Sequence, residues 1–470
     1  MAFRDDFVWG VASASYQVEG AASEGGRTPT VWDMVTHGHP TFKVADGSSG
    51  DVACDAYHRT DEDADLIAGL GVQAYRFSLA WSRIMPGGTG EINHEGLDYY
   101  KRLIDALTSR GVKPYVTLFH WDYPLCLYDR GGWLNDDSPK WFADYATVVA
   151  KELGQSVHHW MTLNEPQCFI GHGHAYGIHA PGLKLPHREV LTVCHNALLA
   201  HGHAVQALRA HADKPTIGWA PVGETRFPAT DDPADIEAAR RETFGVPDSK
   251  GHQHGPVTDL NFFNNAWFSD PVIKGEYPSG DEWNRFHAHL PEPKAGDLET
   301  IAQPLDFYGV NIYSGTPVKA DADGHPVRAT QRTGHPRTMM NWTVTPEALY
   351  WGPKFIAERY GLPVIITENG CAMADWVMRD GKVHDPGRVD FLDRYISQLK
   401  RAAAEGVDIR GYFQWSIMDN FEWGEGYTKR FGLVYVDYET GERIPKDSYH
   451  WYKDVVASNG ANLGPAEGIR

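Results

Sequence analysis

The sequence has little of three features that define whole classes of protein. Only five of its 470 residues are cysteine, and none forms a Cys-x-x-Cys pair, so neither a disulfide scaffold nor a structural zinc ribbon is indicated. No apolar run approaches the ~20 residues that span a bilayer. The first ten residues lack both the basic start and the apolar core of a secretory signal. We therefore expect a cytoplasmic protein that does not enter a membrane.

Positive charge is also scarce. Against 62 Asp+Glu the chain has 43 Lys+Arg, a formal net charge of −19. Nucleic-acid-binding proteins recruit phosphates through clustered Lys and Arg, and the sequence contains no basic stripe, so we expect no nucleic-acid partner. Apolar residues make up 42% of the chain and aromatic residues 12%, which is enough for a large packed core and argues against disorder.

Runs of apolar, β-branched and aromatic residues with the length of strands recur along the chain. There are eight, at residues 7–12, 74–81, 114–121, 159–164, 216–221, 306–313, 363–368 and 410–415. Stretches with helical periodicity lie between them, at residues 61–69, 95–111, 138–154, 188–212, 346–361, 386–406 and 446–458. Strands that alternate with helices indicate parallel pairing through right-handed crossovers. Eight such units predict an α/β fold of the (β/α)8 TIM-barrel type.

An open, doubly wound sheet is the competing fold for this order of elements. It requires a Gly-rich phosphate loop after the first strand, whereas the segment Trp9-Gly-Val-Ala-Ser-Ala-Ser-Tyr-Gln contains one glycine and no Gly-x-Gly-x-x-Gly. We therefore expect one barrel domain over residues 1–470 with long loops after its strands. Residues 224–304 predict a loop-and-helix insertion, and residues 321–340 a second polar excursion.

Polar and aromatic residues follow the predicted strands at the rim where barrels of this kind carry their catalytic groups. Two are glutamates directly after apolar strands, Glu165 and Glu368, where an unpaired buried charge would be costly without a purpose. Arg76, inside the second strand, is expected to pair with a carboxylate. Two carboxylates can break a glycosidic bond, one protonating the leaving oxygen while the other attacks the anomeric carbon or activates water. Aromatic faces can cover the apolar side of a pyranose.

Four motifs resemble those of glycoside hydrolase family 1, the retaining β-glucosidases of (β/α)8 fold, and the resemblance covers nearly the whole chain. They are Phe7-Val-Trp-Gly-Val-Ala-Ser-Ala-Ser-Tyr-Gln-Val-Glu-Gly, Thr162-Leu-Asn-Glu-Pro, Ile366-Thr-Glu-Asn-Gly, and Phe421-Glu-Trp with Lys429-Arg-Phe-Gly-Leu. The resemblance implies hydrolysis of terminal, non-reducing β-D-glucosyl residues by double displacement through a covalent glycosyl-enzyme, without cofactor or metal. It also implies β-galactosidase and β-fucosidase side activity. The implied substrates are small β-glycosides such as cellobiose and aryl or alkyl glucosides, with a part in cellulose degradation.

The same resemblance implies roles by position. Glu165 is the implied general acid/base and Glu368 the nucleophile. Asn164 is implied to hold the sugar 2-hydroxyl, while Arg76 and Tyr313 orient the nucleophile and keep it ionised. The other implied substrate-binding residues are Gln17, His120, Trp121, Asn311, Trp342, Trp415, Glu422, Trp423 and Phe431.

These roles make different electrostatic demands. Glu165 must hold a proton near neutrality, so its pKa should be raised by burial or by nearby negative charge. Glu368 must be charged to attack, and Arg76 with the Tyr313 hydroxyl favours that form. A retaining mechanism predicts that the carboxyl oxygens of Glu165 and Glu368 lie about 5–5.5 Å apart.

The sequence departs from the family pattern at one position beside the predicted site. Gln167 stands where much of the family has tryptophan, which predicts a more polar rim on the aglycone side. Glu422 and Trp423 are retained, whereas members acting on 6-phosphoglycosides carry small residues there, so a non-phosphorylated glycone is favoured. Cys168 and Cys371, close to the two glutamates, are expected to pack beside the site without being reactive.

Two other functions stay open. A metal-dependent barrel hydrolase is suggested by 23 histidines, although their pairs fall in loops or on helix 188–212, where two histidines face different sides. Those His-x-His pairs are His37/His39, His172/His174, His201/His203, His252/His254 and His287/His289. A non-catalytic sugar-binding protein on the same scaffold would be expected to have lost one carboxylate, and both are present. The sequence leaves the oligomeric state open.

Overall fold

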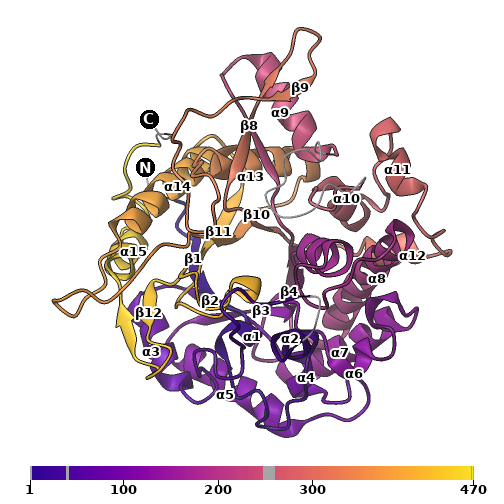
Figure 1. Ribbon diagram of the computed structural model, residues 1–470, viewed down its shortest axis with the longest axis vertical. Coiled ribbons are helices and arrows are strands. Elements are labelled where there is room, and N and C mark those ends of the chain that lie inside the picture. Colours follow the sequence, from indigo (N-terminus) through magenta and orange to yellow (C-terminus); the bar gives the residue numbers. More distant parts are fainter. Residues whose placement is uncertain (1–2, 39–41, 247–259, 467, 469–470) are drawn as a thin grey trace.

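Eight parallel strands form a barrel at the centre of the computed structural model, which describes residues 3–38, 42–246, 260–466 and 468 (Figure 1). The neighbouring strands follow the order β5-β4-β3-β2-β1-β11-β10-β7. Their bounds are β1 (Val8–Ala12), β2 (Ala74–Ser78), β3 (Lys113–Phe119), β4 (His159–Asn164), β5 (Thr216–Ala220), β7 (Tyr308–Asn311), β10 (Val364–Asn369) and β11 (Ile409–Trp415). All eight predicted strands are confirmed. Several end earlier than predicted, because apolar residues continue from the strands into the loops that follow.

Backbone hydrogen bonds between β5 and β7 bring the two ends of this sheet together. The Asp306 amide donates to the Ile217 carbonyl across 2.8 Å, and the Asn311 amide donates to the Pro221 carbonyl across 3.0 Å. At the opposite side of the barrel the first and last strands, β1 and β11, pair in parallel register. The structure therefore confirms the predicted (β/α)8 barrel and not the open sheet.

Helices surround the barrel (Figure 1). The seven predicted from periodicity are all present, as α3 (Thr60–Gly69), α5 (His94–Ser109), α7 (Ser138–Leu153), α8 (His187–His211), α13 (Ala348–Tyr360), α14 (Pro386–Ala404) and α15 (Asp447–Ala457). On α5 the periodicity predicts one apolar face of Leu97, Tyr100, Leu103, Ile104 and Leu107; four of these residues are buried and Leu103 is half-buried. Helices on the outside and side chains on the inside cover both faces of the sheet, which suits its continuous apolar strands. Among the described residues, none of the helices has the length and apolar character needed to cross a bilayer.

Short elements lie in the loops that follow the barrel strands. The helices are α1 (Ser15–Val18), α2 (Val31–Thr36), α4 (Trp81–Ile84), α6 (Leu125–Tyr128) and the π-helix η2 (Cys168–Tyr176); the strands are the antiparallel pair β12 (Val434–Val436) and β13 (Arg443–Pro445). The π-helix directly follows β4 and Glu165. Helices of this type occur frequently at functional sites.

The insertion predicted at residues 224–304 contains more than loops and helices. Its first strand, β6 (Thr225–Pro228), pairs in parallel with β8 (Gly315–Ala320), which pairs with β9 (Pro326–Arg328) in a small second sheet (Figure 1, top). The helices of the insertion are α9 (Pro233–Phe244), α10 (Ala266–Lys274), α11 (Asn284–His287) and α12 (Asp297–Ile301). The sequence did not predict this sheet, because β6 lies in the insertion whereas its partner β8 lies between β7 and the polar excursion at residues 321–340.

Candidate active site

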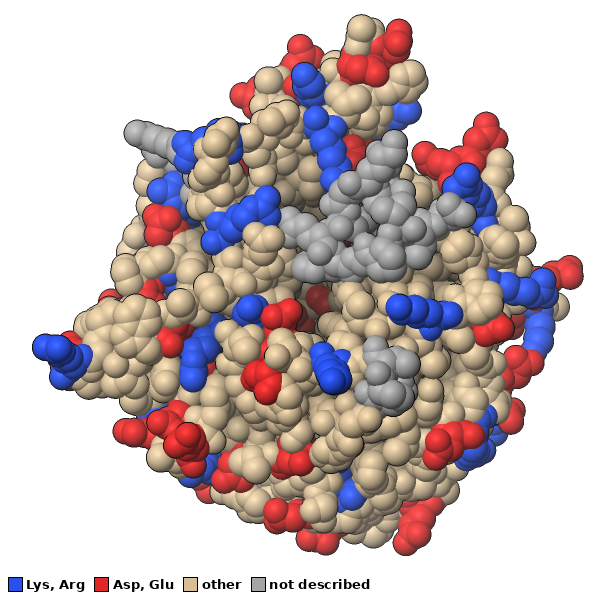
Figure 2. All heavy atoms as spheres, in the orientation of Figure 1, with Lys and Arg blue, Asp and Glu red and all other residues tan. Residues whose placement is uncertain are grey.

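A cavity of about 720 Å³ opens at the carboxyl ends of the barrel strands. Figure 2 shows its mouth near the middle of this face, with acidic atoms inside it. Eleven of the predicted site residues line it: His120, Trp121, Glu165, Asn311, Tyr313, Trp342, Glu368, Trp415, Glu422, Trp423 and Phe431. Gln17, Arg76 and Asn164 are buried directly behind this lining. The barrel thus brings together every residue that the sequence predicted for the site.

Glu368, near the end of β10, is held by charged and polar donors. The Nη1 atom of Arg76 donates to its Oε1 across 2.5 Å, and the Tyr313 hydroxyl donates to its Oε2 across 2.6 Å. Both carboxyl oxygens therefore accept a hydrogen bond, one of them from a permanent cation. Arg76 is 1% exposed, so its predicted pairing with a carboxylate is confirmed.

Two asparagines connect Glu368 to the second glutamate. The Nη2 atom of Arg76 donates to Oδ1 of Asn164 across 2.6 Å. The amide nitrogen of Asn311 then donates both to that Asn164 oxygen, at 3.0 Å, and to Oε1 of Glu165, at 2.9 Å. These side chains come from β2, β4, β7 and β10, so the site depends on closure of the barrel.

Glu165 lies immediately beyond β4 in a left-handed backbone conformation, with φ +43°. Its backbone amide donates to the Ala220 carbonyl at the end of β5 across 2.7 Å. The side chain is 7% exposed, and its Oε2 accepts a hydrogen bond from the Cys168 thiol at 3.1 Å. Cys168 was expected only to pack beside the site; in the structure it lines the cavity and contacts the carboxyl directly.

Burial raises the pKa values of both glutamates. Burial, and then the negative charge of Glu368, raise the pKa of Glu165 to about 8, as the sequence predicted. Burial also raises the pKa of Glu368, while the Arg76 charge and the Tyr313 hydroxyl oppose that rise. The expected contribution of Arg76 and Tyr313 is therefore present, but it does not cancel the cost of burial. Arg76 and Tyr313 thus favour the charged form of Glu368 against the effect of burial.

His120 lines the cavity and holds a buried hydrogen-bond donor without a partner among the described residues. Arg76 can only donate, so the Asn164 atom that it contacts is the carbonyl oxygen, and the Asn164 amide nitrogen faces Nε2 of His120 at 3.0 Å. Burial, followed by the Arg76 charge, lowers the pKa of His120 well below its usual range. The neutral ring accepts at Nε2 and carries its proton on Nδ1, which has no partner within the described part of the chain.

Aromatic rings cluster around His120. The ring of Trp423 lies 4.6 Å from that of Trp121 and 5.8 Å from that of His120, and Trp415 lies 5.7 Å from His120. Trp121 also donates its indole N–H to the backbone carbonyl of Asn164 at 2.9 Å. These rings form an apolar surface beside hydrogen-bonding groups, as a pyranose requires.

Gln17 and Glu422 form the polar end of this part of the cavity. The Gln17 amide nitrogen donates to Asn420 Oδ1 at 3.0 Å and to the Phe421 carbonyl at 2.8 Å, and lies 3.4 Å from Glu422 Oε2. Its Oε1 is buried without a partner among the described residues. Burial, with the charges of Glu368 and Glu165, raises the pKa of Glu422 to about 8. Both side chains can accept hydrogen bonds from hydroxyl groups.

The outer wall of the cavity contains residues that the sequence did not single out as substrate contacts. Trp342 packs on Tyr313 with ring centroids 5.1 Å apart, as predicted for a wall residue. The π-helix contributes Cys168, His172 and Tyr176 to the lining, and the Phe263 and His172 ring centroids lie 4.3 Å apart. The four-residue spacing of these three residues was visible in the sequence, but a π-helix was not predicted there.

The interpretation of Gln167 as part of a polar rim is wrong. Gln167 is fully buried and is not among the residues that line the cavity. Its Oε1 accepts from the Val222 amide at 3.1 Å, and its Nε2 donates to the carbonyls of Val222 at 3.3 Å and Asn264 at 3.2 Å. The side chain points away from the cavity because these backbone groups would otherwise be buried unpaired. Gln167 therefore connects two segments of the cavity wall from behind.

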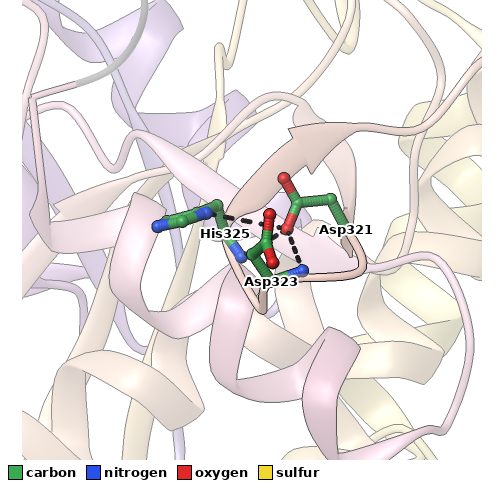
Figure 3. Close-up of side chains that lie close together, drawn as sticks. All are labelled: Asp321, Asp323 and His325. Carbon is green, nitrogen blue, oxygen red and sulfur yellow. Dashed lines mark hydrogen bonds and ion pairs between the residues drawn. The ribbon is translucent and has the colours of Figure 1, made fainter.

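Among the described residues, the histidine pairs that raised the possibility of a metal are not assembled into a cluster of metal ligands. On α8, His201 is buried against Thr162 while His203 is half-exposed beside Gln206, as predicted. His39, His252 and His254 lie outside the described residues. Within the described ranges, one group has the spacing of metal ligands, Asp321, Asp323 and His325 on the turn between β8 and β9 (Figure 3). All three are exposed and none lines the cavity.

Comparison with known proteins gives one consistent result. Residues 1–461 match the family described as Glycosyl hydrolase family 1. The chain is 44% identical over 460 residues to Beta-glucosidase A of Thermotoga maritima, covering 97% of this chain and 98% of that protein. It is 39% identical over 487 residues to a bifunctional beta-D-glucosidase/beta-D-fucosidase of Bifidobacterium breve, covering 98% and 99%. The solved structure of a beta-glucosidase from Thermotoga maritima in complex with glucoimidazole superposes with a TM-score of 0.86 at 42% identity, covering 98% of this chain and 99% of that one.

Proposed function

The chain belongs to glycosyl hydrolase family 1 and is a β-glucosidase, and we propose that it acts by double displacement with Glu368 as nucleophile and Glu165 as acid/base. One observation carries this proposal. The two glutamates face one cavity and are connected through Arg76, Asn164 and Asn311, yet only Glu368 is paired with a cation. Two carboxyl groups with such different partners suit the two different roles that the reaction needs.

In the first step, a Glu368 oxygen bonds to the anomeric carbon while the bond from that carbon to the aglycone oxygen breaks. The proton of Glu165 passes to the departing oxygen, so the aglycone leaves as a neutral alcohol. Arg76 and Tyr313 hold the attacking carboxylate in place and favour its charged form. The product of this step is a covalent glycosyl-enzyme.

In the second step, Glu165 takes a proton from water, whose oxygen attacks the anomeric carbon and releases Glu368. Glycosylation neutralises Glu368, and the charge of Glu368 is one cause of the raised Glu165 pKa. The pKa of Glu165 should therefore fall in the intermediate, at the point where Glu165 must become a base. Measurement of this pKa in a trapped glycosyl-enzyme tests the idea, and an unchanged value would contradict it.

The glucosyl unit binds among His120, Trp121, Trp423, Gln17 and Glu422 in this proposal. His120 Nδ1–H and Gln17 Oε1 are buried beside the cavity without a partner among the described residues, and in this proposal they hydrogen-bond to sugar hydroxyls in the complex, together with the Glu422 carboxyl. Because Gln17 and Glu422 can receive a 4-hydroxyl in either orientation, we expect β-galactosidase and β-fucosidase side activity. The relative named as a beta-D-fucosidase supports the latter.

The substrates are small β-glycosides. We propose cellobiose and aryl or alkyl glucosides as the members of this class that the enzyme hydrolyses, because the outer wall with Trp342, Phe431 and Phe263 is apolar and aromatic. Release of glucose from cellobiose would place the enzyme at the end of cellulose breakdown.

A proton NMR time course of a β-glucoside digest in the presence of chelator tests the proposal. β-Glucose should appear first in the wild type, whereas Glu368→Ala should be inactive and should regain turnover with added azide or formate. Initial α-glucose would show inversion and contradict the assigned roles. Loss of wild-type activity on chelation would instead favour the metal-dependent alternative, and an inactive wild type that binds glucosides would favour the sugar-binding alternative.

We also propose that residues 1–470 act as one domain in a reducing cytoplasm. The first and last barrel strands pair with each other, so neither end of the chain can leave the barrel without opening it. All five cysteines are unpaired, and four of them are buried, which suits a compartment that keeps thiols reduced. A single calorimetric unfolding transition and recovery in the cytosolic fraction of the native host are the expected results.

A further inference from the structure

Cys168 contacts the carboxyl group that we propose as the acid/base. Its Sγ lies 3.1 Å from Oε2 of Glu165, and its backbone amide donates to the Glu165 carbonyl at 2.9 Å. The side chain is 8% exposed and lines the cavity. Because Cys168 is the first residue of the π-helix, the contact is fixed by the backbone of the segment that carries both residues.

The other oxygen of Glu165 is already occupied. Asn311 presents its amide nitrogen to Oε1, and its orientation is defined because the same nitrogen donates to the Asn164 oxygen that already accepts from Arg76. A carboxyl oxygen that accepts from an amide N–H cannot use the same direction for its own proton. The proton of the acid form therefore belongs on Oε2, the oxygen beside Cys168.

A thiol is an unusual partner for that oxygen. It donates weakly to a carboxylate and accepts weakly from a protonated acid, whereas a hydroxyl would donate a strong, charge-assisted hydrogen bond to the ionised form. Burial, and then the negative charge of Glu165, raise the pKa of the Cys168 thiol well above its usual range. The thiol therefore stays protonated and acts only through its weak S–H group.

We propose that Cys168 is a positioning residue for Glu165: its thiol directs Oε2 and, as a weak donor, leaves that oxygen readily protonated until the aglycone departs. This inference rests on the proposed function, in which Glu165 is the acid/base. The role belongs to this particular side chain. A serine hydroxyl at the same place would stabilise the carboxylate form through a stronger hydrogen bond, and alanine would form no hydrogen bond with either form.

Other charged and titratable groups face this pair and stay unchanged when Cys168 is replaced. They are Glu368 and Arg76 on β10 and β2, Tyr313 and Glu422 across the cavity, and Glu224 on the side of the thiol. A change in the pH dependence of kcat/KM that differs between side chains at position 168 therefore reports the contact with Glu165.

The test is the pH dependence of kcat/KM for cellobiose, a substrate with a poor leaving group, in Cys168→Ser and Cys168→Ala. The serine variant should move the basic limb to lower pH by about 0.5–1, which is a loss of about three- to tenfold on that limb. The alanine variant should move the limb to higher pH. Cys126→Ser, at a half-buried cysteine outside the cavity, should leave the limb in place.

Identical basic limbs in the wild type and both Cys168 variants would overturn the inference, even if kcat falls, because a packing defect lowers the rate without moving the pKa. Glu165→Gln separates this failure from failure of the proposed function. If Glu165→Gln keeps the basic limb on an activated aryl glucoside, then Glu165 is not the acid and both proposals fail. If the limb disappears in Glu165→Gln but does not move in the Cys168 variants, only the inference about Cys168 fails.

Discussion

The guanidinium of Arg76 lies 2.5 Å from the carboxyl of Glu368, although 292 residues separate the two in the sequence. The same guanidinium donates to Asn164, so one buried side chain orients groups on β4 and β10 together. A buried cation with two acceptors of this kind fixes geometry as well as charge. The groups at the cavity surface are therefore oriented from behind, by the buried side chain of Arg76.

Replacement of Tyr313 by phenylalanine should weaken the nucleophile. The Tyr313 hydroxyl lowers the pKa of Glu368, so its loss should raise that pKa and move the acidic limb of the kcat/KM profile to higher pH. A hydrogen bond to a charged group is worth about 1.5–3 kcal/mol, which corresponds to a loss of roughly 10- to 100-fold in kcat/KM. Tyr350→Phe, which removes a tyrosine bond to Glu405 outside the cavity, is the matched control. An unchanged acidic limb would contradict the role.

Glu165→Gln should stabilise the protein in a pH-dependent way. The folded-state pKa of Glu165 is about 8 and its usual value is 4.5, so between these values the folded protein keeps a proton that the unfolded chain loses. Stability contributed by this proton is complete below pH 4.5 and is lost as the pH rises toward 8. Glutamine does not titrate, so the variant should gain nothing in Tm at pH 4.5 and about 2–4 °C at pH 8. Equal Tm differences between variant and wild type at both pH values would refute this prediction. Glu439→Gln, at an exposed glutamate, is the control and should show no such pH dependence.

Gln167→Leu should loosen the aglycone side of the cavity from behind. It removes the side-chain partner of the part-buried Val222 and the buried Asn264 backbone groups, at a cost of about 1–3 kcal/mol in the free energy of unfolding. The KM for cellobiose should rise while inhibition by glucose, which fills only the glycone end, should not change. A parallel rise in the KM for cellobiose and in the inhibition constant for glucose would show that the whole cavity has moved. Gln206→Leu, on the outer side of α8, tests for a general effect of the substitution.

Lys446→Met should disrupt the segment that presents Glu422 and Trp423. The Lys446 ammonium is fully buried and donates to Asp375 at 2.6 Å and Asp419 at 2.7 Å. Breaking such a buried pair costs about 3–5 kcal/mol, because the carboxylates remain buried without their cation. We expect a large fall in Tm and weaker binding of glucose. Lys453→Met, at an exposed lysine on α15, should change neither the Tm nor glucose binding. If the Tm of Lys446→Met matched that of this control, the structural role of Lys446 would be ruled out.

The position of Cys168 illustrates the limit of reading this site from the sequence. Its closeness to Glu165 along the chain was evident, but the sequence could not show that the backbone continues as a π-helix and directs the thiol to Oε2. Gln167 is the converse case, because the sequence predicted it at the cavity rim and the structure places it behind the cavity wall. In both cases the direction of a side chain depends on backbone geometry beyond the periodicity that a sequence displays.

The sequence by itself determined the strands, the surrounding helices and both glutamates at strand ends, because apolar periodicity and short motifs are local properties of the chain. The tertiary structure alone decided which groups meet. The pairing of Arg76 with Glu368, the route through Asn164 and Asn311 to Glu165, and the second sheet of β6, β8 and β9 all join distant segments. The unequal environments of the two glutamates arise from burial and from neighbours brought by barrel closure, and neither exists before the chain has folded.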